Sequence, residues 1–230
     1  MPFTLRSSRS ARRISAVVCA ALLSAEAPAL LVAQMPTASN TTVPDPGFSF
    51  TPYLGMVLPT ASLLATTATG APLKLATALT FGARVGIGLG DRFGIDGDVG
   101  YSPGSLEVDA TGVKTNQDVQ TITASGRLTF YLIPRSSPLW LGVSGGVGAI
   151  RHTFSNTGVA AASAISAGTN VGGVIGASAG IRLGKLLAIN VGAEDYLYNA
   201  SFDINGVKST ERKQHDIRLS AGIRIPFLGI

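Results

Sequence analysis

The stretch RLSAGIRIPF, residues 218–227, interleaves two arginines with aliphatic residues. A helix would place Arg218 and Arg224 on opposite sides, because an α-helix repeats every 3.6 residues. In a strand, every second residue from Ile217 to Phe227 is apolar, and the residues between them are polar or small. This period of two predicts a strand with one apolar face and one charged face. A half-buried strand of a soluble sandwich has the same pattern, so the rest of the chain must decide between them.

The composition is apolar, yet the apolar residues are dispersed. Charged residues make up 13% of the 230 residues, the mean hydropathy is +0.35, and 28 glycines disfavour long helices. After residue 33, no segment offers the roughly 18 uninterrupted apolar residues that a membrane helix needs. A membrane β-barrel is expected to combine high hydropathy with such dispersion.

The first 33 residues have the pattern of a secretory signal. Basic residues between Arg6 and Arg13 precede an apolar stretch that ends at Ala33. We predict a signal peptide over 1–33 and a short periplasmic linker over 34–46. An uncleaved helical anchor, a twin-arginine signal and a lipoprotein signal at the single cysteine, Cys19, are weaker alternatives.

Loss of this segment removes four arginines and the only cysteine. The remaining chain is then only slightly basic, which leaves no electrostatic argument for a nucleic-acid partner. Without its only cysteine, the remaining chain can form no disulfide and carry out no thiol chemistry.

Eight segments alternate between apolar and polar or small residues. They span 48–58, 78–89, 92–101, 120–132, 139–154, 171–183, 187–197 and 216–227. Short turns near 90–91, 134–138 and 184–185 separate them in alternation with longer connections near 59–76, 103–116, 155–168 and 199–212. Short turns on one side and long loops on the other are typical of an outer-membrane barrel. We therefore predict an all-β, eight-stranded antiparallel transmembrane up-and-down barrel over 47–227, with both termini in the periplasm.

If the sheet closes, the apolar parity faces lipid and the polar parity faces a lumen that side chains fill. The charged residues of the polar parity are then expected to pair inside, because isolated charges there would be costly. This predicted lumen charge network comprises Arg84, Asp96, Asp98, Arg127, Arg182, Glu194, Asp216, Arg218 and Arg224. Aromatic residues near strand ends predict an interfacial girdle of Phe48, Phe93, Tyr101, Phe130, Trp140 and Phe227. Asp195 has the outward parity, which suits either a rim position or a local bulge.

The signal, the eight alternating segments, the loop asymmetry and the AGIRIPF ending resemble the small eight-stranded outer-membrane barrels, such as the OmpA transmembrane domain and OmpX-type proteins. The resemblance covers about residues 47 to 227 and includes no catalytic motif. It implies an outer-membrane location, contact with outer-membrane lipid, and handling by the barrel assembly machinery during biogenesis. Such barrels end on an aromatic assembly signal, whereas Leu228, Gly229 and Ile230 follow Phe227 here.

The sequence offers few candidates for chemistry. His152 and His215 are the only histidines, and we interpret both as solvated residues at the loop rim. Ser155 has the wrong parity to pair with His152 in a catalytic triad, and two isolated histidines make a poor metal site. The glycine spacing in GLGDRFG (88–94) does not match a nucleotide fingerprint. We predict no catalytic residue, no cofactor and no metal.

The leading hypothesis is a non-enzymatic barrel with a filled lumen that contributes to envelope structure or to surface interaction through four extracellular loops. Three alternatives stay open: an adhesion or ligand-binding surface protein, a rim enzyme that modifies lipid A, and a small-solute channel. The loops are the candidate binding surface for any partner.

Overall fold

The computed structural model describes residues 47–60, 73–110, 113–155, 168–184, 187–201, 203–204, 207–208 and 211–227. The predicted signal peptide and linker lie outside these residues. Eight long strands form the fold: β1 (Phe48–Pro59), β3 (Ala78–Gly88), β4 (Phe93–Ala110), β5 (Val113–Ile133), β6 (Leu139–Phe154), β7 (Gly168–Arg182), β8 (Ala188–Ala200) and β11 (Arg212–Phe227). Short strands are β2 (Leu73–Leu75), β9 (Asp203–Ile204) and β10 (Val207–Lys208). Within the described ranges, the structure has no helix of the length and hydropathy needed to cross a membrane.

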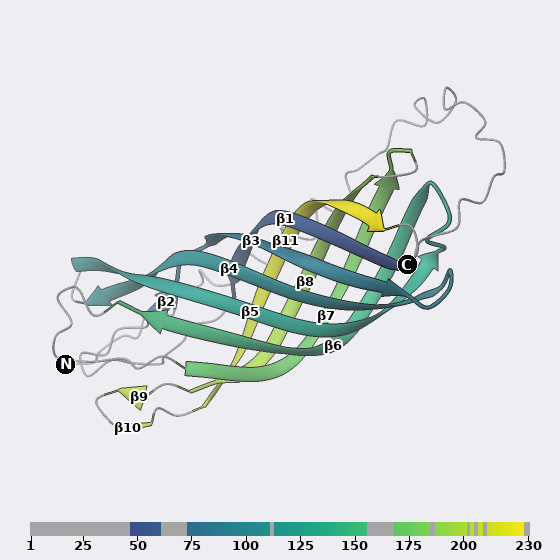
Figure 1. Cartoon of the computed structure of the whole chain (residues 1–230). Helices are drawn as coiled ribbons and strands as arrows, with labels where there is room; N and C mark the ends of the chain where they lie inside the picture. The colour runs from purple at the N-terminus through teal and green to yellow at the C-terminus, as the bar shows by residue number, and fades with distance from the viewer. Residues whose placement is uncertain are drawn as a thin grey trace, which may run out of the picture. The chain divides into compact units, whose positions relative to one another are not determined.

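The long strands pair in the order β4-β3-β1-β11-β8-β7-β6-β5, and a further β4–β5 pairing joins the two ends of this series. All of these pairings are antiparallel. Figure 1 shows β3 to β6 on the near side, with β7, β8 and β11 crossing behind them. The fold is therefore a closed, eight-stranded antiparallel barrel, which confirms the predicted fold class.

The connections between strands differ at the two ends of the barrel. At the turn end, β3–β4, β5–β6 and β7–β8 join through few residues, and Gly90 and Gly184 adopt positive φ angles of 87° and 85° there. Glycine suits these positions because a side chain is strained at positive φ. At the loop end, the connections β1–β3, β6–β7 and β8–β11 are longer.

The predicted loop over 103–116 is wrong. β4 continues to Ala110 and β5 begins at Val113, and these two residues pair at the tip of a continuous ladder. The polar composition of this segment indicated contact with water, but two strands can keep pairing beyond an apolar belt. Loss of apolar alternation therefore marks the edge of the belt rather than the end of the strands.

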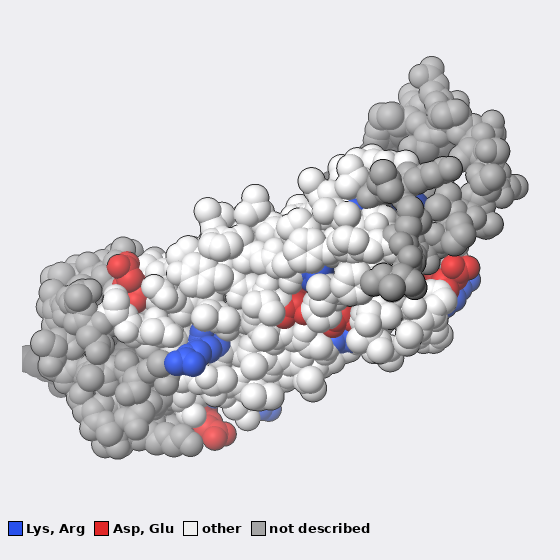
Figure 2. Space-filling model, viewed as in Figure 1, with Lys and Arg blue, Asp and Glu red and all other residues white. Residues whose placement is uncertain are grey.

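The outer face of the barrel is apolar around its middle. Leu79 and Val171 are each 72% exposed and Leu54 is 69% exposed, although burial of such side chains normally stabilises a fold. Figure 2 shows that charged atoms are sparse over the middle of this face. Water would make such a surface prone to aggregation, whereas lipid would cover it.

Five of the six residues predicted for the aromatic girdle lie on the outer face of the barrel. The rings of Phe48 and Phe227 lie 5.4 Å apart, and those of Phe93 and Phe130 lie 5.2 Å apart, at the turn end. Tyr101, farther toward the loop end, packs 5.3 Å from Phe81. All of these except the half-buried Tyr101 are exposed.

Trp140 is a correction to the girdle prediction, because its side chain is 2% exposed and points into the lumen. It shares the parity of the inward glycines on β6. Gly180, its pairing partner on β7, leaves the space: a Cβ there would lie 2.3 Å from the indole ring. Position near a strand end was therefore a weaker signal than strand parity.

Leu128 tests which face of the sheet meets lipid, since its side chain is 53% exposed at an outward position of β5. We expect Leu128→Arg to lower the free energy of unfolding in lipid vesicles by about 2–4 kcal/mol, because a charge then enters hydrocarbon. Thr153→Arg, at an exposed outward position near the loop end of β6, is the matched control and should cost about 1 kcal/mol or less. Equal costs for the two variants would contradict an apolar face in lipid.

Candidate functional site in the lumen

The middle of the lumen holds an ion cluster built from five strands. Strand parity turns its members inward, and each is nine-tenths or more buried. The lumen ion cluster consists of Arg84 on β3, Asp98 on β4, Arg127 on β5, Glu194 on β8 and Arg218 on β11. Five of the nine residues predicted for the charge network thus meet in one place.

Glu194 is the hub of the lumen ion cluster. Its carboxylate accepts from Arg84 and Arg127 through one oxygen, and from Nε of Arg218 at 2.7 Å through the other. Because β8 is not a neighbour of β3 or β5 in the sheet, the first two bonds cross the lumen. A buried carboxylate paired with three guanidinium groups has its desolvation offset by charge and by hydrogen bonds together.

Asp98 is the second acceptor. Nη2 of Arg218 donates to it at 2.6 Å, and Nη2 of Arg84 lies 3.5 Å from its other oxygen. The cluster therefore holds three cations and two anions. Strands β4 and β11 are separated by β3 and β1, so the Arg218–Asp98 pair also spans the interior.

Uncharged residues complete the cluster and were missed as site residues by the sequence analysis. Tyr53 Oη accepts from Nη1 of Arg218 at 2.7 Å and donates to Asp98 at 3.2 Å. The Arg218 guanidinium also stacks over the rings of Tyr53 and Tyr196, at 5.0 and 5.2 Å from their centroids. Gly100 leaves room for this group, because a Cβ there would lie 2.9 Å from Arg218 Nη1. The inward parity of both tyrosines was visible in the sequence, but their contacts were not.

Above the cluster, toward the loop end, the lumen is filled by apolar side chains. This apolar lumen layer consists of Val119, Ile150, Phe154, Val174, Tyr196, Tyr198 and Ala200. Its members come from β5, β6, β7 and β8 and are at most 8% exposed. A layer of apolar and tyrosine side chains therefore adjoins the ion cluster on its loop-end side.

His152 lies in this apolar region, so its prediction as a solvated rim residue is wrong. Its side chain is fully buried, its ring stacks on that of Phe154 with the centroids 6.4 Å apart, and the Tyr198 ring lies tilted against it at 6.3 Å. The even spacing between His152 and Phe154 gives them a common inward face. The wall extends farther toward the loop end than the sequence indicated, and the histidine is enclosed by it.

Two further predicted acids lie inside but take hydroxyl donors. Tyr198 Oη donates to Asp216 at 2.6 Å within the loop-end half. Thr129 donates to Asp96, which lies nearer the turn end than Asp98. Among the ion pairs between described residues, neither acid takes part. The predicted charge network is therefore divided into layers.

The two remaining predicted arginines lie at the turn end. Arg182 donates through Nε at 3.2 Å to the backbone carbonyl of Arg135, and the Arg224 guanidinium lies 5.8 Å from the Trp140 ring centroid. Arg135 is itself 1% exposed and stacks over Tyr131. It was missed because it belongs to a turn, where strand parity gives no direction.

The outer wall carries a second ionisable pair near the loop end. Nδ1 of His215 lies 3.3 Å from the carboxylate of Asp195, and the imidazole is 52% exposed. The β8–β11 and β7–β8 registers run without a shift through Asp195, so its outward position needs no bulge. His215 and His152 thus lie on opposite faces of the wall and cannot share a site.

Each charged group of the lumen ion cluster pairs with another member of it, although Nε of Arg84 and Nε of Arg127 make no hydrogen bond. The described residues contain no group of three or more His, Cys, Asp or Glu side chains placed to hold a metal. The five charges of the lumen ion cluster link strands that are not neighbours, so we assign it the task of fixing the barrel's cross-section.

Glu194→Gln tests this assignment. The amide keeps the shape but removes the charge that faces three arginines, so we expect the free energy of unfolding to fall by about 3–5 kcal/mol. Asp118→Asn, at an exposed outward position of β5, is the control and should change stability by about 0.5 kcal/mol or less. Denaturant titration of the refolded barrel in vesicles measures both, and a loss below about 1 kcal/mol for Glu194→Gln would contradict a structural cluster.

Comparison with known proteins gives matches in structure but not in sequence. No protein-family model and no curated protein matches this chain. The outer membrane protein OprG from Pseudomonas aeruginosa superposes with a TM-score of 0.60 at 12% identity, covering 80% of this chain and 97% of that one.

Two further solved structures are similar. AlkL, an outer membrane protein determined in DMPC lipid bilayers, has a TM-score of 0.52 at 18% identity, with 84% of this chain and 95% of that one covered. Neisserial surface protein A has a TM-score of 0.51 at 13% identity, with 79% of this chain and 97% of that one covered. At these identities the likeness concerns the backbone architecture, and the chain has the fold of the small eight-stranded outer-membrane β-barrels.

Proposed function

We propose that this chain is an integral outer-membrane barrel with an occluded lumen and no enzymatic activity. Its role is in envelope structure or in surface interaction through the connections at the loop end. The observation that carries the proposal is the lumen ion cluster, whose bonds cross the interior from Glu194 to Arg84 and Arg127, and from Asp98 to Arg218.

The membrane location is supported by the outward side chains. Large aliphatic residues are exposed on each long strand, and aromatic pairs lie on the outside toward both ends. Closure also leaves no unpaired strand edge among the long strands, as hydrocarbon requires. By analogy with the outer membrane protein AlkL, whose structure was determined in lipid bilayers, lipid is the partner of this face. The predicted signal peptide, periplasmic termini and assembly machinery belong to the same proposal.

Occlusion of the lumen is supported by three successive layers. The apolar lumen layer, the lumen ion cluster and the turn-end arginines fill different heights of the interior. The cavity beside Trp140, Arg182 and Arg224 has a volume of about 10 Å³, which is the space of about one water molecule. A path for solutes would have to break the cross-lumen ion pairs, so we rank the small-solute channel below a structural role.

The rim-enzyme hypothesis is weakened by the placement of the histidines. His152 is enclosed among aromatic rings, and His215 faces outward beside Asp195. A general base must reach both its nucleophile and a substrate. Burial separates His152 from any substrate, and the described hydrogen-bond partner of His215 is a carboxylate rather than a nucleophile. An adhesion or ligand-binding role would act through the loop-end connections, whose central residues lie outside the part of the chain that the structure describes.

Heat modifiability of the outer-membrane fraction tests the proposal. We expect the unboiled protein to migrate differently from the boiled protein on a detergent gel, because a closed barrel resists detergent at room temperature. The control is the same chain refolded from denaturant without detergent or lipid. A protein recovered from the soluble periplasm, with identical mobility before and after boiling, would contradict a membrane barrel.

Ion conductance in planar bilayers tests the occluded lumen. The folded protein is expected to give no unitary current steps in potassium chloride, since the cross-lumen ion pairs leave no continuous aqueous path. A porin inserted in the same bilayer verifies that steps are detectable. Reproducible steps that disappear when the protein is boiled before insertion would refute occlusion and favour the channel.

A further inference from the structure

On β5 and β6 the outward surface changes from apolar to polar at one row of paired residues. Strand register aligns this boundary row across five strands: Phe81, Tyr101, Ile122, Arg151 and Thr169. The row below it, toward the turn end, is wholly apolar and consists of Ala83, Val99, Ala124, Ala149 and Val171. Above it, Gln120 and Thr153 pair on β5 and β6. On β5 and β6 this change marks the approach to the headgroups, and strand tilt carries the row to other depths on the neighbouring strands.

Arg151 is a cation on the lipid side of this row. Its side chain is exposed, its direct neighbours are Ile122 and Thr169, and it takes part in none of the ion pairs among the described residues. The outward carboxylate of Asp118 lies four residues along β5 from Ile122, about 13 Å away in a strand. Arginine at a membrane boundary is therefore available to an anion from the lipid itself.

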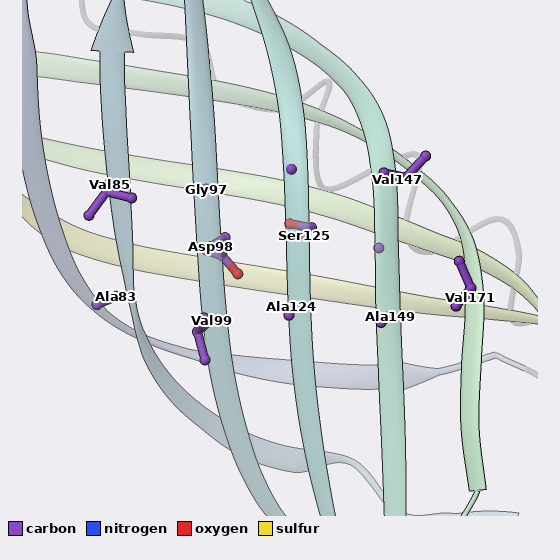
Figure 3. A pocket seen from close by; sticks show the side chains of 12 residues that line it. Ala83, Val85, Gly97, Asp98, Val99, Ala124, Ser125, Val147, Ala149 and Val171 are labelled. Atoms are coloured by element: carbon purple, nitrogen blue, oxygen red, sulfur yellow. The ribbon is translucent and has the colours of Figure 1, made fainter.

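An apolar groove of about 600 Å³ lies on the outer surface directly below Arg151. Ala149, which lines it, precedes Arg151 by two residues and shares its face. Figure 3 shows Val85 on one side of the groove and Val147 and Val171 on the other. Small residues form the floor between them: Ala83, Gly97, Ala124, Gly126 and Ala149.

The polar atoms behind this floor do not oppose an apolar occupant. Asp98 reaches the groove lining from the lumen side, but its carboxylate is bound by Arg84 and Arg218 and its side chain is fully buried. A Cβ on Gly126 would meet nothing within 4 Å, so the space above that residue is open. The groove is thus a place where a flexible hydrocarbon chain can gain contacts that a flat wall does not offer.

We propose that Arg151 and this groove form a binding site for a phosphorylated, multiply acylated glycolipid of the outer leaflet, the chemistry of lipid A. The guanidinium pairs with a phosphate, Thr169 supplies a neighbouring hydroxyl, and one acyl chain lies in the groove. The inference rests on the proposed membrane location, with the loop end outward. A second copy of the chain is the less favourable occupant, because its contact would bury Arg151 with no described acid opposite it.

The test is native mass spectrometry of the folded barrel in detergent, titrated with bis-phosphorylated lipid A and, separately, with dephosphorylated lipid A and phosphatidylglycerol. Arg151→Gln removes the phosphate partner, and we expect about tenfold weaker retention of lipid A. Gly126→Leu fills the groove without touching Arg151 and should weaken retention severalfold.

Two matched variants separate a site from general charge or bulk. Lys213→Gln removes another exposed outward cation near the loop end, and Gly145→Leu adds a side chain at an outward glycine that also has nothing within 4 Å. Both are expected to retain lipid A like the unchanged protein. Dephosphorylated lipid A should bind the unchanged protein as weakly as lipid A binds Arg151→Gln.

Equal retention of lipid A by Arg151→Gln and the unchanged protein would overturn the site, as would equal binding of phosphatidylglycerol, which would show only a general preference for acidic lipid. Equal losses in Gly126→Leu and Gly145→Leu would overturn the groove. The heat-dependent gel shift is measured on every sample. Samples that shift but fail these comparisons refute only the lipid site, whereas absence of the shift in the unchanged protein refutes the membrane barrel.

Discussion

The width of an eight-stranded barrel is the constraint on which the rest of this structure depends. At this strand number the interior has room for side chains and little else, so every inward position must be filled by residues that satisfy one another. Charged side chains in such a space need polar partners, and Glu194 and Asp98 find them by receiving three arginines between them. The inward glycines follow from the same constraint, because Gly100 and Gly180 make room for Arg218 and Trp140.

The same alternation along each strand places different kinds of side chain on the inner and outer faces of the wall. Inside, polarity is graded along the axis, from the turn-end arginines through the lumen ion cluster to the apolar lumen layer. Outside, β5 and β6 change toward the loop end from aliphatic residues to the polar pair Gln120 and Thr153. In the loop-end half, the apolar lumen layer therefore lies behind the outward polar pair Gln120 and Thr153 on β5 and β6.

Most of the correct predictions from the sequence came from strand parity, the alternation of apolar and polar residues. It gave the eight strands, the closed fold and the inward direction of all nine predicted charged residues. It could not say at which height each charge lies or which strands meet across the lumen, because these depend on strand tilt and register. Arg135 in a turn and the Tyr53 contact to Arg218 were therefore missed. Trp140 and His152 were misjudged where composition near a strand end was preferred over parity.

The Arg218–Tyr53 bond joins residues 165 positions apart, and β11 pairs with β1 along its length. The barrel can therefore close only when β11 pairs with β1, although these two strands lie at opposite ends of the barrel sequence. Until then Glu194 faces no enclosed arginines, and the cluster stays hydrated. Long-range closure of this kind is slow, because the entropy of bringing the chain ends together is lost before the contacts form. Once the ring is shut, the same ion pairs oppose its opening, so the cluster acts on the lifetime of the folded state more than on the speed of reaching it.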